Sequence, residues 1–142
     1  MEKNSEIASN SHNTSPFLEK KKRDSRFGKF AENIAAEYYM ENGYRLLERN
    51  WRVNHIEIDL IAQKDNTVVF VEVKARKGNC LSGLESVSRS KMKRLLNGAH
   101  IYLKILANEN YEYRMDIFAL TGDEKEYKID VYEDAFVYSM LM

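Results

Sequence analysis

Apolar residues follow two kinds of spacing along the chain, and each kind predicts a different element. Over residues 27–42 they recur three and four positions apart, which is typical of a helix that packs along one stripe. Gly43 follows where a helix C-cap glycine is common. The same spacing returns over residues 89–106, and Ser88 precedes it as an N-cap residue. We therefore predict two helices, each with one apolar face.

Five other stretches predict strands, because they are rich in β-branched and aromatic residues and are bounded by turn-forming residues. They are residues 44–51, the stretch from Ile56 to a turn at residues 64–66, and residues 67–76, 112–120 and 127–131. The links between the first three are short, which predicts an antiparallel meander. The order helix, three strands, helix, two strands predicts an α/β fold in which helices cover a central sheet.

Residues 1–24 do not share either pattern. They are polar and rich in Ser and Asn, contain the single proline, Pro16, and end in a cluster of Lys and Arg. A segment with so few apolar residues cannot offset the entropy lost on ordering. We therefore expect a disordered tail over residues 1–24 and a single domain over residues 25–142, a length that suffices for a core.

Composition narrows the classes of function. The formal net charge of zero does not indicate a nucleic-acid partner, so any attraction to phosphate has to come from a local patch. The single cysteine, Cys80, excludes an internal disulfide and a cysteine-rich zinc site. No apolar run approaches 18 residues, and the start of the chain lacks an apolar signal core. We expect a cytoplasmic protein that does not associate with membranes.

Three charged residues lie inside the most apolar strands: Asp59, Glu72 and Lys74. A charge in a buried sheet costs several kcal/mol unless a partner offsets it. Alternation places Glu72 and Lys74 on one face, about 7 Å apart, and a hairpin that pairs these faces would bring Asp59 close to them. Two carboxylates at short range suit Mg²⁺. An ion pair of Glu72 with Lys74 or Arg76 explains the pattern equally well.

These residues also carry a resemblance. Asp59 followed by Glu72-Val73-Lys74 resembles the PD-(D/E)xK core of metal-dependent nucleases, which occurs in restriction enzymes and archaeal Holliday-junction resolvases. More narrowly, residues 26–136 resemble the YraN-like family of small bacterial predicted nucleases, through the blocks EIDLI at 57–61 and FVEVK at 70–74. The chain departs from the family at Ile56, where glycine is usual, which predicts a different turn into that strand.

The resemblance implies a restriction-endonuclease-like core with a central mixed sheet. It also implies a nuclease that depends on Mg²⁺ or Mn²⁺ and cleaves phosphodiester bonds, in DNA in preference to RNA. Because phosphate contacts carry no sequence information, we expect structure-selective or non-specific cleavage. Asp59 and Glu72 would be metal ligands and Lys74 the catalytic lysine, with Glu32 an additional ligand by analogy with the resolvases. We expect phosphate contacts from the basic residues Arg52, Arg76, Lys91 and Arg94. Because resolvase-like folds often work as dimers, a homodimer is expected by analogy.

Several alternatives stay open. A nucleic-acid-binding module of nuclease ancestry, with little or no activity of its own, would carry the same residues, and the zero net charge favours it somewhat. The same acids could also be purely structural in a protein that binds another protein. Glu32 can equally be an exposed helical glutamate. Glu57 either supports the metal ligands or pairs with Arg52, and Asp116 is expected to pair with Arg114 or a turn amide.

Overall fold

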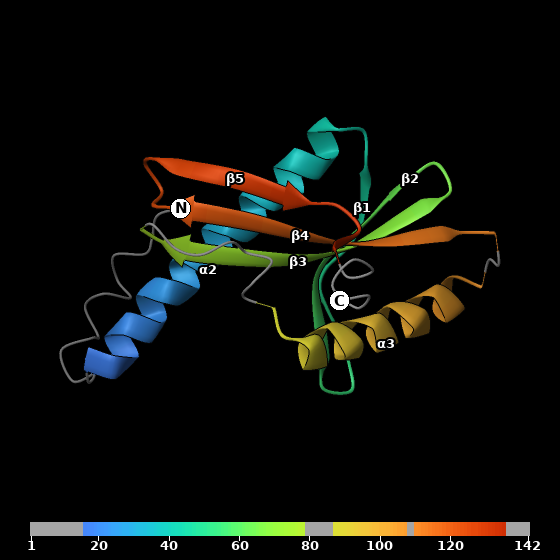
Figure 1. The fold of residues 1–142 in the computed structure, drawn as a ribbon, viewed down its shortest axis with the longest axis horizontal. Helices are drawn as coiled ribbons and strands as arrows, with labels where there is room; N and C mark the ends of the chain where they lie inside the picture. Colours follow the sequence, from blue (N-terminus) through green and yellow to red (C-terminus); the bar gives the residue numbers. More distant parts are fainter. Residues whose placement is uncertain (1–15, 79–86, 108–109, 136–142) are drawn as a thin grey trace.

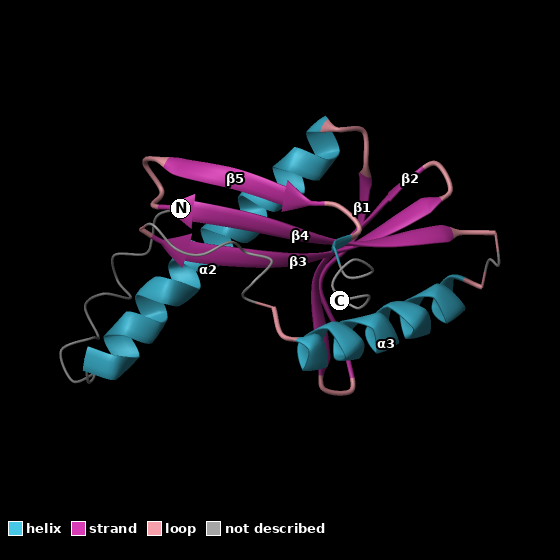
Figure 2. Ribbon diagram, viewed as in Figure 1, coloured by secondary structure: helices cyan, strands magenta, loops and turns pink. Residues whose placement is uncertain are grey.

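The fold is built on one mixed sheet. The computed structural model describes residues 16–78, 87–107 and 110–135, with side chains from residue 26 onward. Within these residues five strands pair in the order in which they occur in the chain, and two helices flank them (Figures 1 and 2). The elements are α2 (Pro16–Glu41), β1 (Arg45–Val53), β2 (Ile56–Lys64), β3 (Thr67–Lys77), α3 (Arg89–Leu106), β4 (Glu112–Gly122) and β5 (Tyr127–Tyr132).

Strands β1, β2 and β3 form the predicted antiparallel meander, whereas β3 and β4 are parallel and β5 returns antiparallel to β4. A parallel pair needs a crossover between its strands. Helix α3 lies in that crossover, between β3 and β4. The architecture is therefore α/β, with a mixed sheet and a helix on each face, as expected for a restriction-endonuclease-like core.

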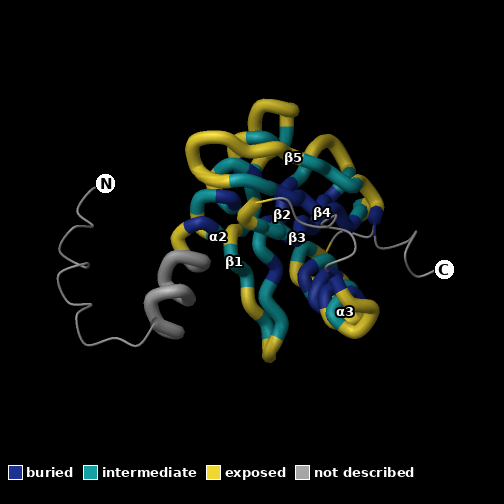
Figure 3. The backbone as a smooth tube through the Cα atoms, turned by 60° about the vertical axis from the view of Figure 1, so that its left-hand side comes forward, coloured by how far each residue is buried: buried dark blue, intermediate teal, exposed yellow. Residues whose placement is uncertain are grey.

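The two helices cover opposite faces of the sheet, because the strand side chains alternate between two apolar clusters. Val69 and Val71 of β3 pack in the cluster that includes Ala31 and Ala35 of α2. Phe70 packs in the other cluster, with several residues of α3. Buried positions accordingly gather in the central strands and on the inner side of α3 (Figure 3). Both faces of β3 are covered along its apolar run.

Strand β2 leaves β3 at Asp59. The β2–β3 ladder runs up to the pair Leu60–Val71, while the residues of β2 before this point pair with β1. Alternation also breaks here, because Ile58 packs on the α3 side and Leu60 on the α2 side. Asn50 of β1, between the positions that pair with Ile58 and Leu60, has a φ of 53°. The β1–β2 hairpin consequently bends away from β3 (Figure 1).

The first helix differs from its prediction. Helix α2 begins at Pro16, so residues 16–24 are helical rather than part of the tail expected from the sequence. Lys, Glu and Arg dominate residues 19–23 and are good helix formers, and proline is favoured at the first helical position. Helix propensity thus extends the helix beyond its apolar stripe. The rest of the expected tail, residues 1–15, lies outside the described residues.

The second helix matches its predicted bounds, and Ser88 caps it as predicted, accepting a hydrogen bond from the backbone N–H of Lys91. Gly98 lies on the side of α3 that faces β2. A Cβ atom added to Gly98 would lie 2.9 Å from Cγ2 of Ile56. The absence of a side chain therefore lets α3 lie close against β2. Among the described residues, neither helix is long and apolar enough to cross a membrane.

Candidate active site

Glu72 is the buried acid at the centre of the candidate site. It lies in β3 on the face that α3 covers, and only 4% of the residue is exposed. Its Oε2 atom forms ion pairs with two lysines, with Nζ of Lys91 at 2.6 Å and with Nζ of Lys74 at 3.4 Å. One lysine is a neighbour on the same strand and the other comes from α3. Two cations therefore offset the charge of one buried carboxylate, which explains why the strand tolerates it.

Asp59 is placed by the divergence of β2 from β3. The register that pairs Leu60 with Val71 would next pair Asp59 with Glu72, but the ladder ends there. Instead, Oδ2 of Asp59 accepts a hydrogen bond of 2.8 Å from the backbone N–H of Val73. The short carboxylate thus bridges the gap and takes the position of the missing backbone acceptor. This hydrogen bond fixes Asp59 beside Glu72.

A cavity of about 220 Å³ opens beside both acids. Its walls come from the β1–β2 turn, from β2, from β3 and from the first two turns of α3. The lining residues are His55, Ile56, Glu57, Asp59, Glu72, Lys91, Arg94 and Leu95. The three α3 residues are spaced i, i+3 and i+4, so they share one face of the helix. The cavity therefore has acids on its sheet side and two cations on its helix side.

Burial first, and the negative charge of Glu72 second, raise the pKa of Asp59 to about 7, although the hydrogen bond from Val73 acts in the opposite direction. Asp59 is thus an acid whose charge is incompletely compensated. Burial also lowers the pKa of Lys74, and the attraction of Glu72 only partly opposes this. For Lys91, burial is outweighed by the hydrogen bond to Glu72 and by the charges of Glu72 and Asp59, so its pKa is raised.

The residues fit a small divalent cation of the Mg²⁺ or Mn²⁺ type. Asp59 and Glu72 are hard oxygen donors that share a cavity, and Mg²⁺ uses one or two protein carboxylates with waters in its other positions. Burial and the charge of Glu72 raise the pKa of Asp59, an effect that a bound cation would oppose. The contacts described above use Oδ2 of Asp59 and Oε2 of Glu72, so the second oxygen of each carboxylate can serve as a ligand.

The structure places Glu32 apart from this pair. Its Oε1 atom lies 3.5 Å from Nδ2 of Asn50, and its charge contributes to the raised pKa of Asp59. It does not line the cavity. In the described part of the chain, no three His, Cys, Asp or Glu side chains form a group that could hold a metal ion. Glu32 thus lies near Asp59 without completing a three-carboxylate set.

The predicted phosphate-binding residues divide into two groups. Lys91 and Arg94 line the cavity. Arg52 forms a 3.3 Å ion pair with Glu57 on the surface, which is one of the two roles expected for Glu57. Arg76 donates to the carbonyl oxygen of Ala75. Lys91 and Arg94 are thus the two of the four basic residues that line the cavity.

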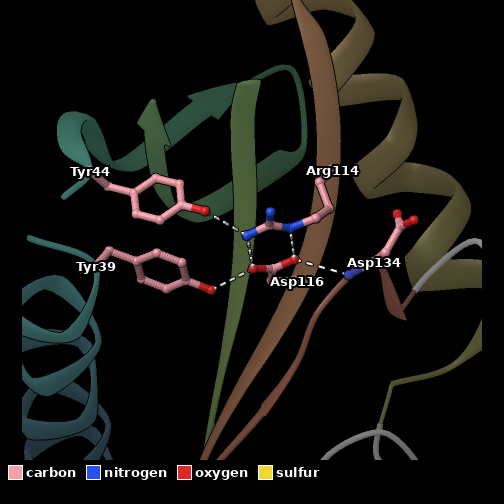
Figure 4. A network of polar contacts seen from close by, with 5 residues as sticks. All are labelled: Tyr39, Tyr44, Arg114, Asp116 and Asp134. Carbon is pink, nitrogen blue, oxygen red and sulfur yellow. Dashed lines mark hydrogen bonds and ion pairs between the residues drawn. The ribbon is translucent and has the colours of Figure 1, made fainter. Parts of the chain in front are cut away.

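Asp116 belongs to a separate buried network (Figure 4). The guanidinium of Arg114 donates to both of its carboxylate oxygens, and the backbone N–H of Asp134 donates to Oδ1. Both partners had been predicted by type, an arginine and a turn amide. The tyrosines had not: Tyr39 donates to Oδ2 at 2.7 Å, and Arg114 donates to the hydroxyl of Tyr44. This network joins the end of α2 to β4 and to the turn after β5.

The sheet order, the flanking helices and the acids at the divergence of β2 and β3 define an α/β protein with a restriction-endonuclease-like core. The profile of the uncharacterised protein family UPF0102 matches residues 31–120, and the chain belongs to this family, so the YraN-like resemblance is confirmed.

Three relatives carry the same family name. The UPF0102 protein of Flavobacterium psychrophilum is 39% identical over 113 residues, covering 78% of this chain and 93% of the relative. The UPF0102 protein of Bacteroides thetaiotaomicron is 36% identical over 113 residues, covering 79% and 93%. The UPF0102 protein of Chloroherpeton thalassium is 40% identical over 101 residues, covering 70% and 78%. The family is therefore established, and the activity has to be argued from the site.

Proposed function

We propose that the protein is a nuclease that hydrolyses phosphodiester bonds in nucleic acid, primarily DNA, with Mg²⁺ or Mn²⁺ held by Asp59 and Glu72. One observation carries the proposal: two carboxylates share a cavity whose opposite wall is cationic. An ordinary structural ion pair would account for Glu72 and Lys74. It would not account for Asp59, whose charge the fold leaves incompletely compensated.

Each residue has a role that follows from its position. The bound ion would polarise a phosphoryl oxygen and lower the pKa of a water ligand. Lys74 does not line the cavity, but it contacts Glu72, and we propose that its ammonium stabilises negative charge that develops on the phosphoryl group held at this carboxylate. Its lowered pKa also makes it a better proton donor than an ordinary lysine. Lys91 and Arg94 provide positive charge for the flanking phosphates.

The predicted substrate preference follows from the kind of contact available. The cations at the cavity would contact phosphates, which position a strand but carry no sequence information. We therefore propose cleavage that is non-specific or selects for nucleic-acid structure. Single-stranded, duplex and branched DNA, with matched RNA, are the substrates that separate these possibilities.

The test compares wild type with Glu72→Gln on these substrates, with Mg²⁺, with Mn²⁺ and with a chelator. Glu37→Gln is a matched control, because it makes the same chemical change at an exposed position of α2. We expect cleavage that requires the ion and falls by roughly 100-fold or more in Glu72→Gln, while the control keeps wild-type activity. Equal cleavage by wild type and Glu72→Gln would refute the site.

A second candidate function is nucleic-acid binding without turnover. It is favoured by the pairing of Glu72 with two lysines and by the lack, in the described residues, of a three-carboxylate group. It predicts DNA binding that weakens with salt and no ion-dependent cleavage of any of these substrates. Ion-dependent cleavage that is lost in Glu72→Gln would exclude it.

A further inference from the structure

The two lysines that contact Glu72 are held differently. Lys74 lies two positions along the same strand, and only 16% of its side chain is exposed. Lys91 reaches Glu72 from α3, and 35% of its side chain is exposed. Both ammonium groups contact the same carboxylate oxygen, and Lys91 makes the shorter contact, at 2.6 Å against 3.4 Å. Lys91 is therefore both the closer partner of Glu72 and the one with more room to leave it.

The backbone of Lys91 is fixed at the start of α3. Its N–H is bound by the Ser88 cap at the start of α3. At the other end of the helical face, Gly98 holds α3 close to Ile56. A lysine in the first turn is unfavourable, because the helix dipole is positive there, and this turn contains no acid. Lys91 thus depends on an anion outside its own helix.

We propose that Lys91 is an internal competitor for the divalent ion. This inference rests on the proposed function, because it concerns the ion-binding carboxylate of the same site. Without the ion, the ammonium of Lys91 neutralises Glu72. An ion bound by Glu72 would repel this ammonium and compete with it for the charge of the carboxylate, and the displaced ammonium would still line the cavity, where a phosphate of the nucleic acid can pair with it.

The proposal has a consequence for binding. A phosphate that pairs with Lys91 removes the competitor from Glu72, so nucleic acid should strengthen ion binding and the ion should strengthen nucleic-acid binding by the same factor. A lysine that only positioned Glu72 would act in the opposite direction: its removal would weaken ion binding. The two roles are therefore separated by the sign of one measurement.

The experiment measures Mn²⁺ affinity by titration calorimetry on the full chain, for wild type, Lys91→Gln and Lys93→Gln. Lys93 is an exposed residue on the same helix and serves as the matched control. We expect Lys91→Gln to bind Mn²⁺ about three- to tenfold more tightly than wild type, as expected when a competing ion pair is removed. Lys93→Gln should bind as wild type does. Lys91→Arg, which keeps the cation, should also stay near the wild-type affinity.

The coupling is measured with Ca²⁺ and a labelled DNA duplex by fluorescence anisotropy. Ca²⁺ should increase DNA affinity in wild type, and this increase should be lost in Lys91→Gln. Thermal unfolding shows whether each variant is folded, and Lys91→Met is the second variant if Lys91→Gln is not.

The proposal would be overturned if folded Lys91→Gln, or folded Lys91→Met in its place, bound Mn²⁺ no more tightly than wild type does. Tighter Mn²⁺ binding without cleavage would uphold the role of Lys91 and refute the nuclease. Cleavage that depends on Glu72, together with Mn²⁺ binding that is not tighter in the Lys91 variants, would uphold the nuclease and refute the role of Lys91.

Discussion

The substitution Asp59→Asn tests the electrostatics of the site most directly. The amide oxygen of asparagine can still accept the hydrogen bond from Val73, so the geometry of the strand divergence is retained. The substitution removes a negative charge that is buried beside Glu72. Burial first, and the charge of Glu72 second, raise the pKa of Asp59 from 3.8 to about 7. Neutralising this residue should therefore stabilise the fold.

The sign and size follow from linkage. An acid whose pKa is higher in the folded state keeps its proton longer when folded, so its contribution to stability is intact below about pH 4 and is lost as the pH rises to about 7. At ~1.4 kcal/mol for each pH unit, this interval corresponds to a loss of up to about 4 kcal/mol in the free energy of unfolding. Asp59→Asn should not show this loss in the free energy of unfolding, because asparagine does not titrate.

The assay is urea unfolding at pH 5 and pH 8 in the presence of a chelator. We expect Asp59→Asn to be more stable than wild type at pH 8, by an amount that shrinks at pH 5. Glu37→Gln, the exposed control, should follow the wild-type curve. Mn²⁺ should stabilise wild type at pH 8 more than it stabilises Asp59→Asn. Parallel pH dependence in wild type and Asp59→Asn would refute this account of the site.

Two further changes test the packing of α3 on β2 and the buried network around Asp116. Gly98→Ala should destabilise the protein by about 1–3 kcal/mol in urea unfolding, because its Cβ would lie 2.9 Å from Cγ2 of Ile56. This loss is expected although alanine is the better helix former. Unchanged or higher stability would argue against close packing of α3 on β2. Tyr39→Phe removes a hydrogen bond to buried Asp116 and should cost about 1.5–3 kcal/mol. A loss below ~0.5 kcal/mol would show that Arg114 and the Asp134 amide satisfy the carboxylate alone.

Much of the fold was predictable because its elements have strong local patterns. Helix α3 has an apolar stripe and a capping serine, and its predicted bounds are confirmed. The five strands also occur where β-branched residues and turns indicated them. The beginning of α2 was missed because residues 16–24 have helix propensity without an apolar stripe. Apolar periodicity detects an amphipathic stripe, so it does not detect helical residues whose sequence lacks one.

The candidate site was predictable to the extent that it is local. Asp59, Glu72 and Lys74 lie in two consecutive strands, and the hairpin register brings Asp59 next to Glu72. The end of the ladder at Leu60 and the hydrogen bond from Val73 to Asp59 have no counterpart in strand periodicity. The ion pair of Lys91 with Glu72 depends on how closely α3 lies against the sheet. The contact of Tyr39 with Asp116 joins residues 77 positions apart. Neither contact can be predicted from the spacing of residues along the chain.

The parallel pairing of β3 with β4 also bears on the order in which the protein folds. The β2–β3 hairpin needs only a short loop, whereas β4 can pair with β3 only after the whole crossover has been closed, which costs more chain entropy. Asp59 and Glu72 therefore meet early, with Lys74 beside them. Lys91 arrives with the crossover helix. We expect Lys74 to offset part of the repulsion between the two acids when the hairpin forms, and Lys91 to offset more of it when α3 docks, so that this pairing favours completion of the sheet.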